Sequence, residues 1–201
     1  MRTRARIERH AGEVTRDQDA PTSDFAARVD RLESIEAIRQ LAARYAVALD
    51  ARDLDTLVEL FVPDVRVGDQ HGRDALRAFF DESLREVGVT ILHVAGHVID
   101  LDPSDPDRAT GIVSCRGELE LFDHPEAGGT TWVVQAIQYH DTYARTAKGW
   151  GFVRRRHLLT YGARLGDDPM TLPPANWPAS QIGRGNLPES LPTWQQFWSP
   201  R

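Results

Sequence analysis

The feature that most constrains the fold of this chain is a single change in hydrophobic period at Gly88. Before Gly88, apolar residues recur at steps of three or four, which is typical of amphipathic helices. After it, long runs have the period of two that is typical of strands, and the helical period does not return before the tail. Helices followed by strands predict an α+β domain. We expect a cone-shaped barrel, with N-terminal helices packed into a strongly curved, mostly antiparallel sheet.

Three helices are predicted before the change of period. The longest spans residues 24–49, the second spans Asp53 to Phe61 and ends before Pro63, and the third follows Gly72 in the segment RDALRAFFDESLREV. Four predicted strands follow, covering residues 89–102, 108–122, 130–146 and 149–165. The gap between the last two predicted strands is short enough for a tight hairpin.

The composition divides the chain into three parts. Residues 1–23 are polar and form an expected leader that is partly disordered, and residues 24–165 form the α+β domain. Residues 166–201 carry seven of the twelve prolines together with Trp177, Trp194 and Trp198. Prolines prevent a regular ladder and tryptophans need burial, so this tail is expected to pack on the domain or on a partner subunit.

Charge and composition exclude several functional classes. A net charge of -6 and a pI of about 5.6 argue against nucleic-acid binding. The chain lacks the run of about 20 apolar residues that a membrane span needs, and a single cysteine, Cys115, fits a reducing compartment. We therefore expect a cytoplasmic protein that does not contact membranes.

Motifs for cofactors and metals are also missing from the sequence. It shows no phosphate-binding loop, no dinucleotide fingerprint and no nucleophile elbow, so cofactor-free chemistry is expected. His93 and His97 are spaced like a metal-binding pair on a helix. On a strand that spacing spans about 13 Å, too far for one shared ion, so no metal site is predicted.

The candidate catalytic residues are Tyr45 and Asp50, near the end of the first helix, His93 in the first long strand and His157 in the last. A free imidazole titrates near pH 6.5, and a carboxylate on its other nitrogen would fix its tautomer. In the alternative interpretation, Asp50 caps the following helix and His93 is a core histidine. Tyr45 and Asp50 are separated by about 140° of helix rotation, so they reach one cavity only if the helix end projects into it.

The last predicted strand and its neighbour add further candidates. Alternation along the strand places Arg155 and His157 on one face and Arg154 and Arg156 on the other. Either Arg155 or His157 could contact a substrate, the alternative being ordinary exposed basic residues. His140 is an additional possible pocket residue.

Three segments, IEAIRQLAARYAVALDARDLDTLVELFVPDV, ILHVAGHVIDLD and YHDTYARTAKGWGFVRRRH, resemble the SnoaL-like branch of the nuclear transport factor-like superfamily, which includes scytalone dehydratase, bile-acid dehydratase, lindane dehydrochlorinase and polyketide cyclases. The resemblance covers roughly residues 24–165. It implies that Tyr45, Asp50 and His93 are catalytic, with His93 and Asp50 acting as an acid-base dyad. An arginine of the bile-acid dehydratase falls on Leu159, so its role would pass to His157 or Arg155.

The function expected from these residues and this resemblance is a cofactor-independent lyase. It would catalyse a dehydratase-type elimination on a hydrophobic cyclic, polyketide-like or terpenoid-like molecule, with Tyr45 assisting the leaving group. A polyketide cyclase, an isomerase or an epoxide hydrolase could use the same pocket, and a non-catalytic binding or dimerisation module is the alternative from another class. The family commonly pairs through its sheet, which implies a homodimer or higher homo-oligomer.

Overall fold

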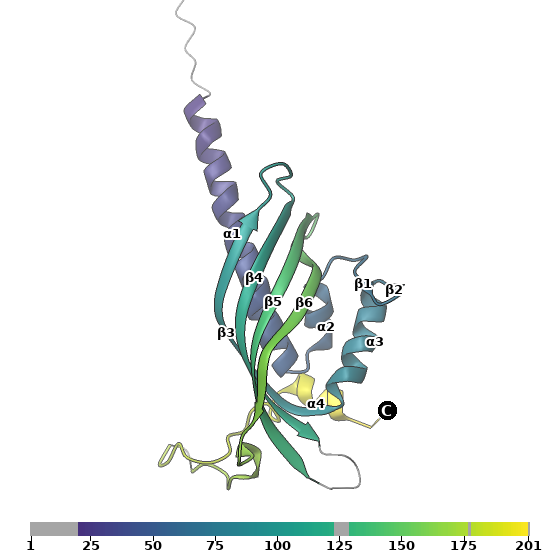
Figure 1. The fold of residues 1–201 in the computed structure, drawn as a ribbon, viewed down its shortest axis with the longest axis vertical. Coiled ribbons are helices and arrows are strands. Elements are labelled where there is room, and N and C mark those ends of the chain that lie inside the picture. Colours follow the sequence, from purple (N-terminus) through teal and green to yellow (C-terminus); the bar gives the residue numbers. More distant parts are fainter. Residues whose placement is uncertain (1–19, 123–128, 177, 201) are drawn as a thin grey trace, which may run out of the picture.

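The computed structural model describes residues 20–122, 129–176 and 178–200, and in these residues helices precede a four-stranded sheet (Figure 1). Residues 1–19 of the predicted leader lie outside this part of the chain. The elements are α1 (Ala20–Asp50), α2 (Leu54–Glu59), β1 (Arg66–Val67), β2 (Gln70–His71), α3 (Arg73–Leu84), β3 (Val87–Leu101), β4 (Arg108–Phe122), β5 (Thr130–Thr146), β6 (Gly149–Arg164), a short 3-10 helix (Pro169–Thr171) and α4 (Pro192–Trp198).

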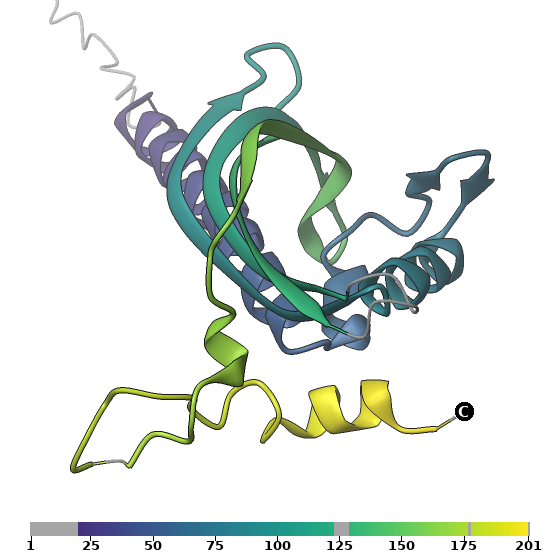
Figure 2. The ribbon, with the colours of Figure 1, turned by 60° about the horizontal axis from the view of Figure 1, so that its bottom comes forward.

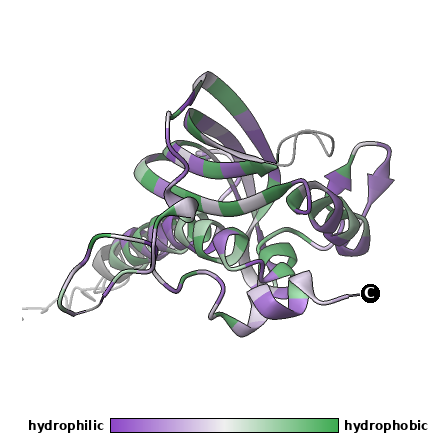
Figure 3. Cartoon of the chain, turned by 90° about the horizontal axis from the view of Figure 1, so that it is seen from below, coloured by the Kyte–Doolittle hydropathy of each residue, from purple (hydrophilic) through white to green (hydrophobic). Residues whose placement is uncertain are grey.

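The predicted α+β class is confirmed. Strands β3 to β6 lie in sequence order, and each neighbouring pair is antiparallel. The sheet curls strongly beside α1 (Figure 2), and apolar and polar residues alternate along its strands (Figure 3). The boundaries of β3 to β6 agree with the predicted runs to within two residues, because strand period and turn residues both change at those points.

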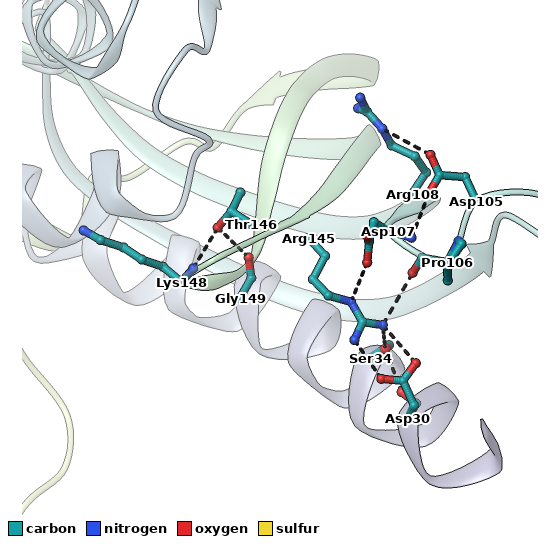
Figure 4. Close-up of polar contacts among 10 residues, drawn as sticks. All are labelled: Asp30, Ser34, Asp105, Pro106, Asp107, Arg108, Arg145, Thr146, Lys148 and Gly149. Carbon is teal, nitrogen blue, oxygen red and sulfur yellow. Dashed lines mark hydrogen bonds and ion pairs between the residues drawn. The ribbon is translucent and has the colours of Figure 1, made fainter. Parts of the chain in front are cut away.

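Helix α1 begins at Ala20, four residues before the predicted start. Pro21 lies in its first turn, where a missing backbone N–H costs nothing because that group has no partner within the helix. Arg145 of β5 fastens this half of α1 to the sheet (Figure 4). Its guanidinium donates to Asp30 at 2.7 and 3.0 Å and to Ser34 at 2.8 Å, and it forms an ion pair with Asp107 at 3.2 Å.

The concave side of the sheet is packed with aromatic rings rather than left open around α1. Tyr45 contacts four rings edge-on at centroid distances of 5.9–6.4 Å. The rings come from α2, α3, β5 and β6 and their adjoining residues, and they are Phe61, Phe80, Tyr139 and Phe152. Side chains therefore occupy the space beside Tyr45 on this side of the sheet.

A bulge in β3 changes which side chains share a face. The register with β4 shifts between Val94 and Gly96, so that Val94 pairs with Cys115 and His97 pairs with Val113. A bulge inserts one extra residue and reverses the alternation beyond it. His93 and His97 consequently lie on opposite faces of β3, although their spacing of four would otherwise place them on the same face.

The C-terminal tail returns to the domain through α4, below the end of α1 in Figure 2. Trp194 is buried against Val89, Trp132 and Val134, and Thr193 donates a hydrogen bond of 2.9 Å to the carbonyl of Ala51. Burial of apolar surface thus holds both α4 and the edge of β3 in place. None of the helices in the described part of the chain has the length and apolar character needed to cross a membrane.

Candidate active site

Asp50 is the last residue of α1, and its carboxylate meets the free edge of β3. One carboxylate oxygen accepts a hydrogen bond from the hydroxyl of Thr90 at 2.9 Å, and the other accepts one from the backbone N–H of Leu92 at 2.9 Å. Because β3 is an edge strand, this N–H would otherwise lack a ladder partner. The two bonds fix the orientation of the carboxylate and leave further lone pairs on each oxygen.

Arg52 lies directly behind this carboxylate and is only 2 % exposed. Its guanidinium donates to Thr90 Oγ1 and to the carbonyl of Leu49, both at 2.8 Å, and to the carbonyls of Val87 and Gly88. Thr90 therefore accepts from Arg52 while it donates to Asp50. A buried cation is linked to the carboxylate through one hydroxyl.

The environment shifts the pKa values of both charged groups. Burial raises the pKa of Asp50 above its ordinary value, although the N–H of Leu92, the hydroxyl of Thr90 and the charges of Arg52 and His93 all oppose the shift. Burial also lowers the pKa of Arg52 to about 10, against the attraction of Asp50. Burial thus favours the protonated form of this carboxyl relative to that of a solvent-exposed aspartate.

Asp50 and Thr90 line a cavity of about 490 Å³ beside the edge of β3. Its other lining residues are mostly apolar and come from α1, β3 and the tail: Val47, Ala51, Val89, Ile91, Pro169, Met170, Leu172, Gly183, Arg184, Gly185, Leu187, Pro188 and Leu191. An apolar cavity with a few convergent polar groups is the usual form of a small-molecule site.

His93 lies next to this site without a hydrogen bond to Asp50. The side chain of His93 is exposed, and its strand position pairs with Arg116. It occupies the same face of β3 as Ile91, two residues before it, which lines the cavity. The charge of His93 acts on Asp50, yet no hydrogen bond joins these two described side chains. The predicted dyad is therefore close in space but not formed.

The alternative interpretation of Asp50 and His93 does not fit this geometry. Asp53, not Asp50, caps α2: its side chain accepts from the backbone N–H of Thr56 at 3.0 Å. An exposed His93 is not a core histidine either. Tyr45, by contrast, is a core aromatic, and burial raises its pKa to about 12. As the helix rotation predicts, the side chains of Tyr45 and Asp50 leave α1 in different directions.

A second polar cluster lies inside the sheet, and the sequence revealed only one of its members. Arg155 and Asp141 form a two-pronged ion pair with N–O distances of 3.0 and 2.7 Å, and their side chains are 5 % and 0 % exposed. The guanidinium also lies 4.3 Å from the ring centroids of Tyr45, Tyr139 and Phe152. Burial opposes the charge of Arg155, but the hydrogen bonds and charge of Asp141 outweigh it and raise the pKa of Arg155.

The cluster continues to β3 through a tyrosine. Tyr143 donates to Asp141 at 2.9 Å and lies 3.0 Å from Nε2 of His97, which therefore carries the proton on that nitrogen. Burial lowers the pKa of His97. Gly111 leaves room for this contact, since a Cβ there would lie 2.7 Å from the carbonyl oxygen of Val98 and 3.2 Å from Nε2 of His97.

The remaining predicted residues are divided between the two faces of the sheet. His157 packs edge-on against Tyr139 at 5.5 Å, on the face of Arg155, and burial lowers its pKa. His140 pairs in register with Arg156, on the opposite face, and its Nε2 lies 3.3 Å from Gln138. His140 and Arg155 therefore do not face one site.

Sequence reasoning missed Thr90, Arg52, Asp141, Tyr143 and His97. A usable signal existed for Asp141: alternation in β5 puts it on the apolar face between Tyr139 and Tyr143, where an unpaired carboxylate is costly and an arginine partner is required. The position of His97 depends on the bulge in β3, for which the sequence gives no clear signal.

We predict that Thr90→Val raises the pKa of Asp50 further, because it removes a hydrogen bond that stabilises the carboxylate. The carboxyl ¹³C chemical shift of Asp50, followed by NMR as a function of pH, measures this pKa. Thr90→Ser restores the hydroxyl and should restore the value, and Thr160→Val on β6 is the control. An unchanged pKa in Thr90→Val would contradict the assigned contact.

We predict that Arg155→Met lowers the free energy of unfolding by about 3–5 kcal/mol, because it leaves the carboxylate of Asp141 buried without a counter-ion. Urea denaturation followed by tryptophan fluorescence measures the loss. The matched control Arg156→Met, on the exposed face, should stay within about 0.5 kcal/mol of the parent. Adding Asp141→Leu to Arg155→Met should recover much of the loss, and no recovery would argue against an uncompensated charge.

Comparisons with known proteins fit the curved-sheet architecture. A hexachlorocyclohexane dehydrochlorinase (LinA) type 2 has a TM-score of 0.59 and 20% identity, covering 70% of this chain and 95% of its own. A putative scytalone dehydratase from Novosphingobium aromaticivorans has a TM-score of 0.55 and 20% identity, with coverage of 70% and 93%. An NTF2-like protein with a cystatin-like fold from the same organism has a TM-score of 0.51 and 29% identity, with coverage of 73% and 92%.

A search of curated proteins finds no match. A family model described as a SnoaL-like domain matches residues 30–156, which is more than half of the chain and spans α1 to the middle of β6. It stops before the proline-rich tail. The chain therefore belongs to the SnoaL-like domain family.

Proposed function

We propose that this protein is a cofactor-independent lyase that eliminates water from a hydrophobic cyclic molecule of the polyketide or terpenoid type. One observation carries the proposal: the carboxyl of Asp50, whose pKa is raised by burial, borders an apolar cavity at the strand that bears His93. The fold is that of lyase-type and isomerase-type enzymes of small molecules, and neighbours of this fold include a dehydrochlorinase and a putative dehydratase.

Separate roles for the two side chains follow from the lack of a hydrogen bond between them. His93 accepts the proton from a carbon activated by a carbonyl or a ring, and the electron pair of the C–H bond forms the new double bond. The C–O bond to the leaving hydroxyl breaks, and the protonated carboxyl of Asp50 supplies the proton that completes water. Catalytic hydrogen bonds commonly reach full alignment only when substrate is bound.

The other predicted contacts remain predictions. Tyr45 is surrounded by the aromatic core, so a leaving group would have to enter that core to reach its hydroxyl. The guanidinium of Arg155 is already bound by Asp141. His157, at the outer end of the same face, is the freer of the two predicted contacts on β6. His140 would serve a substrate only on the opposite face of the sheet.

We predict that Asp50→Asn and His93→Ala each lower turnover by about 10²–10⁴-fold, because each removes one partner in proton transfer. The assay incubates the protein with a panel of hydroxylated cyclic ketones and measures the product mass, which falls by one water on dehydration. His71→Ala, at the exposed end of β2, is the control and should keep full activity. Full turnover in either of the two site variants would reject the assignment.

The same measurement separates the alternatives. An unchanged mass indicates cyclisation or isomerisation, and a gain of one water indicates epoxide hydrolysis. A non-catalytic ligand-binding module is the second candidate, favoured by the packed concave side and by the unformed bond between His93 and Asp50. It would bind these compounds without converting them.

We also propose a homodimer that pairs through the convex face of the sheet. Val98 and Ile112 lie opposite each other there, 62 % and 40 % exposed. Val98→Lys should shift the sedimenting species towards the monomer, because a charge in an apolar interface costs its desolvation. Leu32→Lys, on the exposed surface of α1, is the matched control. A monomeric parent protein at micromolar concentration would rule out the pairing.

A further inference from the structure

We infer that the C-terminal tail forms the outer wall of the substrate pocket and restricts it to neutral, largely apolar ring compounds that carry a hydroxyl group. This inference rests on the proposed function in one respect, namely that Asp50 is the group that meets the substrate. The tail lies beyond the residues that the SnoaL-like family model matches. The wall is therefore built by residues outside the part of the chain that the family model matches.

The tail is fastened to the domain on both sides of the wall. At its beginning, the N–H of Leu165 donates to the carbonyl of Trp132 at 2.9 Å, and Thr130 hydrogen-bonds Asp168. At its end, Thr193 bonds the carbonyl of Ala51 and Trp194 is buried. Segments anchored at both ends lose little further entropy when a ligand binds, so the wall is preformed.

Within the wall, two stretches of the tail are clamped together. The N–H of Ala175 donates to the carbonyl of Arg184 at 2.8 Å, and the N–H of Arg184 donates to the carbonyl of Pro173 at 2.9 Å. Gly183 permits this approach with a φ of 122°, since a Cβ there would lie 2.4 Å from the carbonyl oxygen of Pro173. This backbone clamp holds the two stretches of the tail together.

The chemistry of the lining defines the ligand. Met170, Leu172, Leu187 and Leu191 face the cavity from the tail, opposite Ile91 from β3. The cavity of about 490 Å³ lies within the usual size range of small-molecule sites.

The polar side chains of the lining are few, namely Asp50, Thr90 and Arg184. Arg184, the one cationic side chain among the described residues of the lining, is paired with Glu189, so its charge is compensated. Asp50 and Thr90 offer the carboxyl and hydroxyl oxygens to a donor. A neutral molecule with a hydroxyl therefore fits better than a charged one.

The test uses 2-naphthol, a neutral two-ring phenol, titrated into the full ¹⁵N-labelled chain and followed by NMR. We expect saturable shifts at the amides of Ala51, Val89 and Ile91. Leu172→Arg should raise the dissociation constant about tenfold or more, because it puts a charge into the apolar wall. Ile182→Arg, 85 % exposed and outside the lining, is the matched control and should bind like the parent.

Three outcomes would overturn the inference. The first is that chemical shifts change only in the separate cavity of β4 to β6 around Ser114 and Gln135. The second is that Leu172→Arg and Ile182→Arg bind 2-naphthol with equal affinity. The third is that 2-naphthol does not bind while Leu172→Arg changes the sedimenting mass, which would mean that a second copy of the chain covers the wall. Binding is measured without turnover. If Asp50→Asn loses turnover and one of these outcomes is also observed, the proposed reaction is retained and only the proposed role of the tail is rejected.

Discussion

The buried guanidinium of Arg52 is the interaction on which the arrangement of the candidate site depends. Arg52 follows α1 with a φ of 56°, a conformation that usually selects glycine at a helix end. An arginine is accommodated because its side chain turns back to bond Leu49 and continues to the first residues of β3. It also stacks 4.9 Å from Trp194 of α4. One side chain thus joins the end of α1, the edge of the sheet and the tail. It is linked to Asp50 through the hydroxyl of Thr90, which accepts from Arg52 and donates to Asp50.

The carboxylates of Asp141 and Asp50 differ in how fully their surroundings compensate their charge. Asp141 has a bidentate arginine, a tyrosine hydroxyl and no exposure, so its charge is fully compensated and its contribution is to hold β5 and β6 around Tyr45. Asp50 accepts hydrogen bonds from one hydroxyl and one backbone N–H, and the nearby cation, Arg52, reaches it only through Thr90. The weaker compensation lets burial raise the pKa of Asp50, and the adjacent cavity gives its oxygens access to a ligand.

Elements with a clear period were predictable, and contacts between distant elements were not. The long strands were predictable because apolar and polar residues alternate in the runs after Gly88, and because these runs end at proline-rich or glycine-rich gaps. Resemblance to the family points to Asp50 and His93, and their proximity to one cavity depends on the docking of α1 against the edge of β3. The bulge between Val94 and Gly96 decides the faces of His93 and His97, and the sequence gives no clear signal for the inserted residue.

Asp50 lies where the domain that the family model matches meets the C-terminal tail. The carboxylate sits at the edge of the sheet, between the concave side, where Tyr45 and its aromatic neighbours fill the space, and the outer side, where the tail passes. Packing the concave side strengthens the core but removes room for a substrate there. A tail placed across the outer side restores an enclosed apolar space next to the same acid. The chemistry of Asp50 would then remain with the domain, while the residues that discriminate between substrates would lie in the added segment.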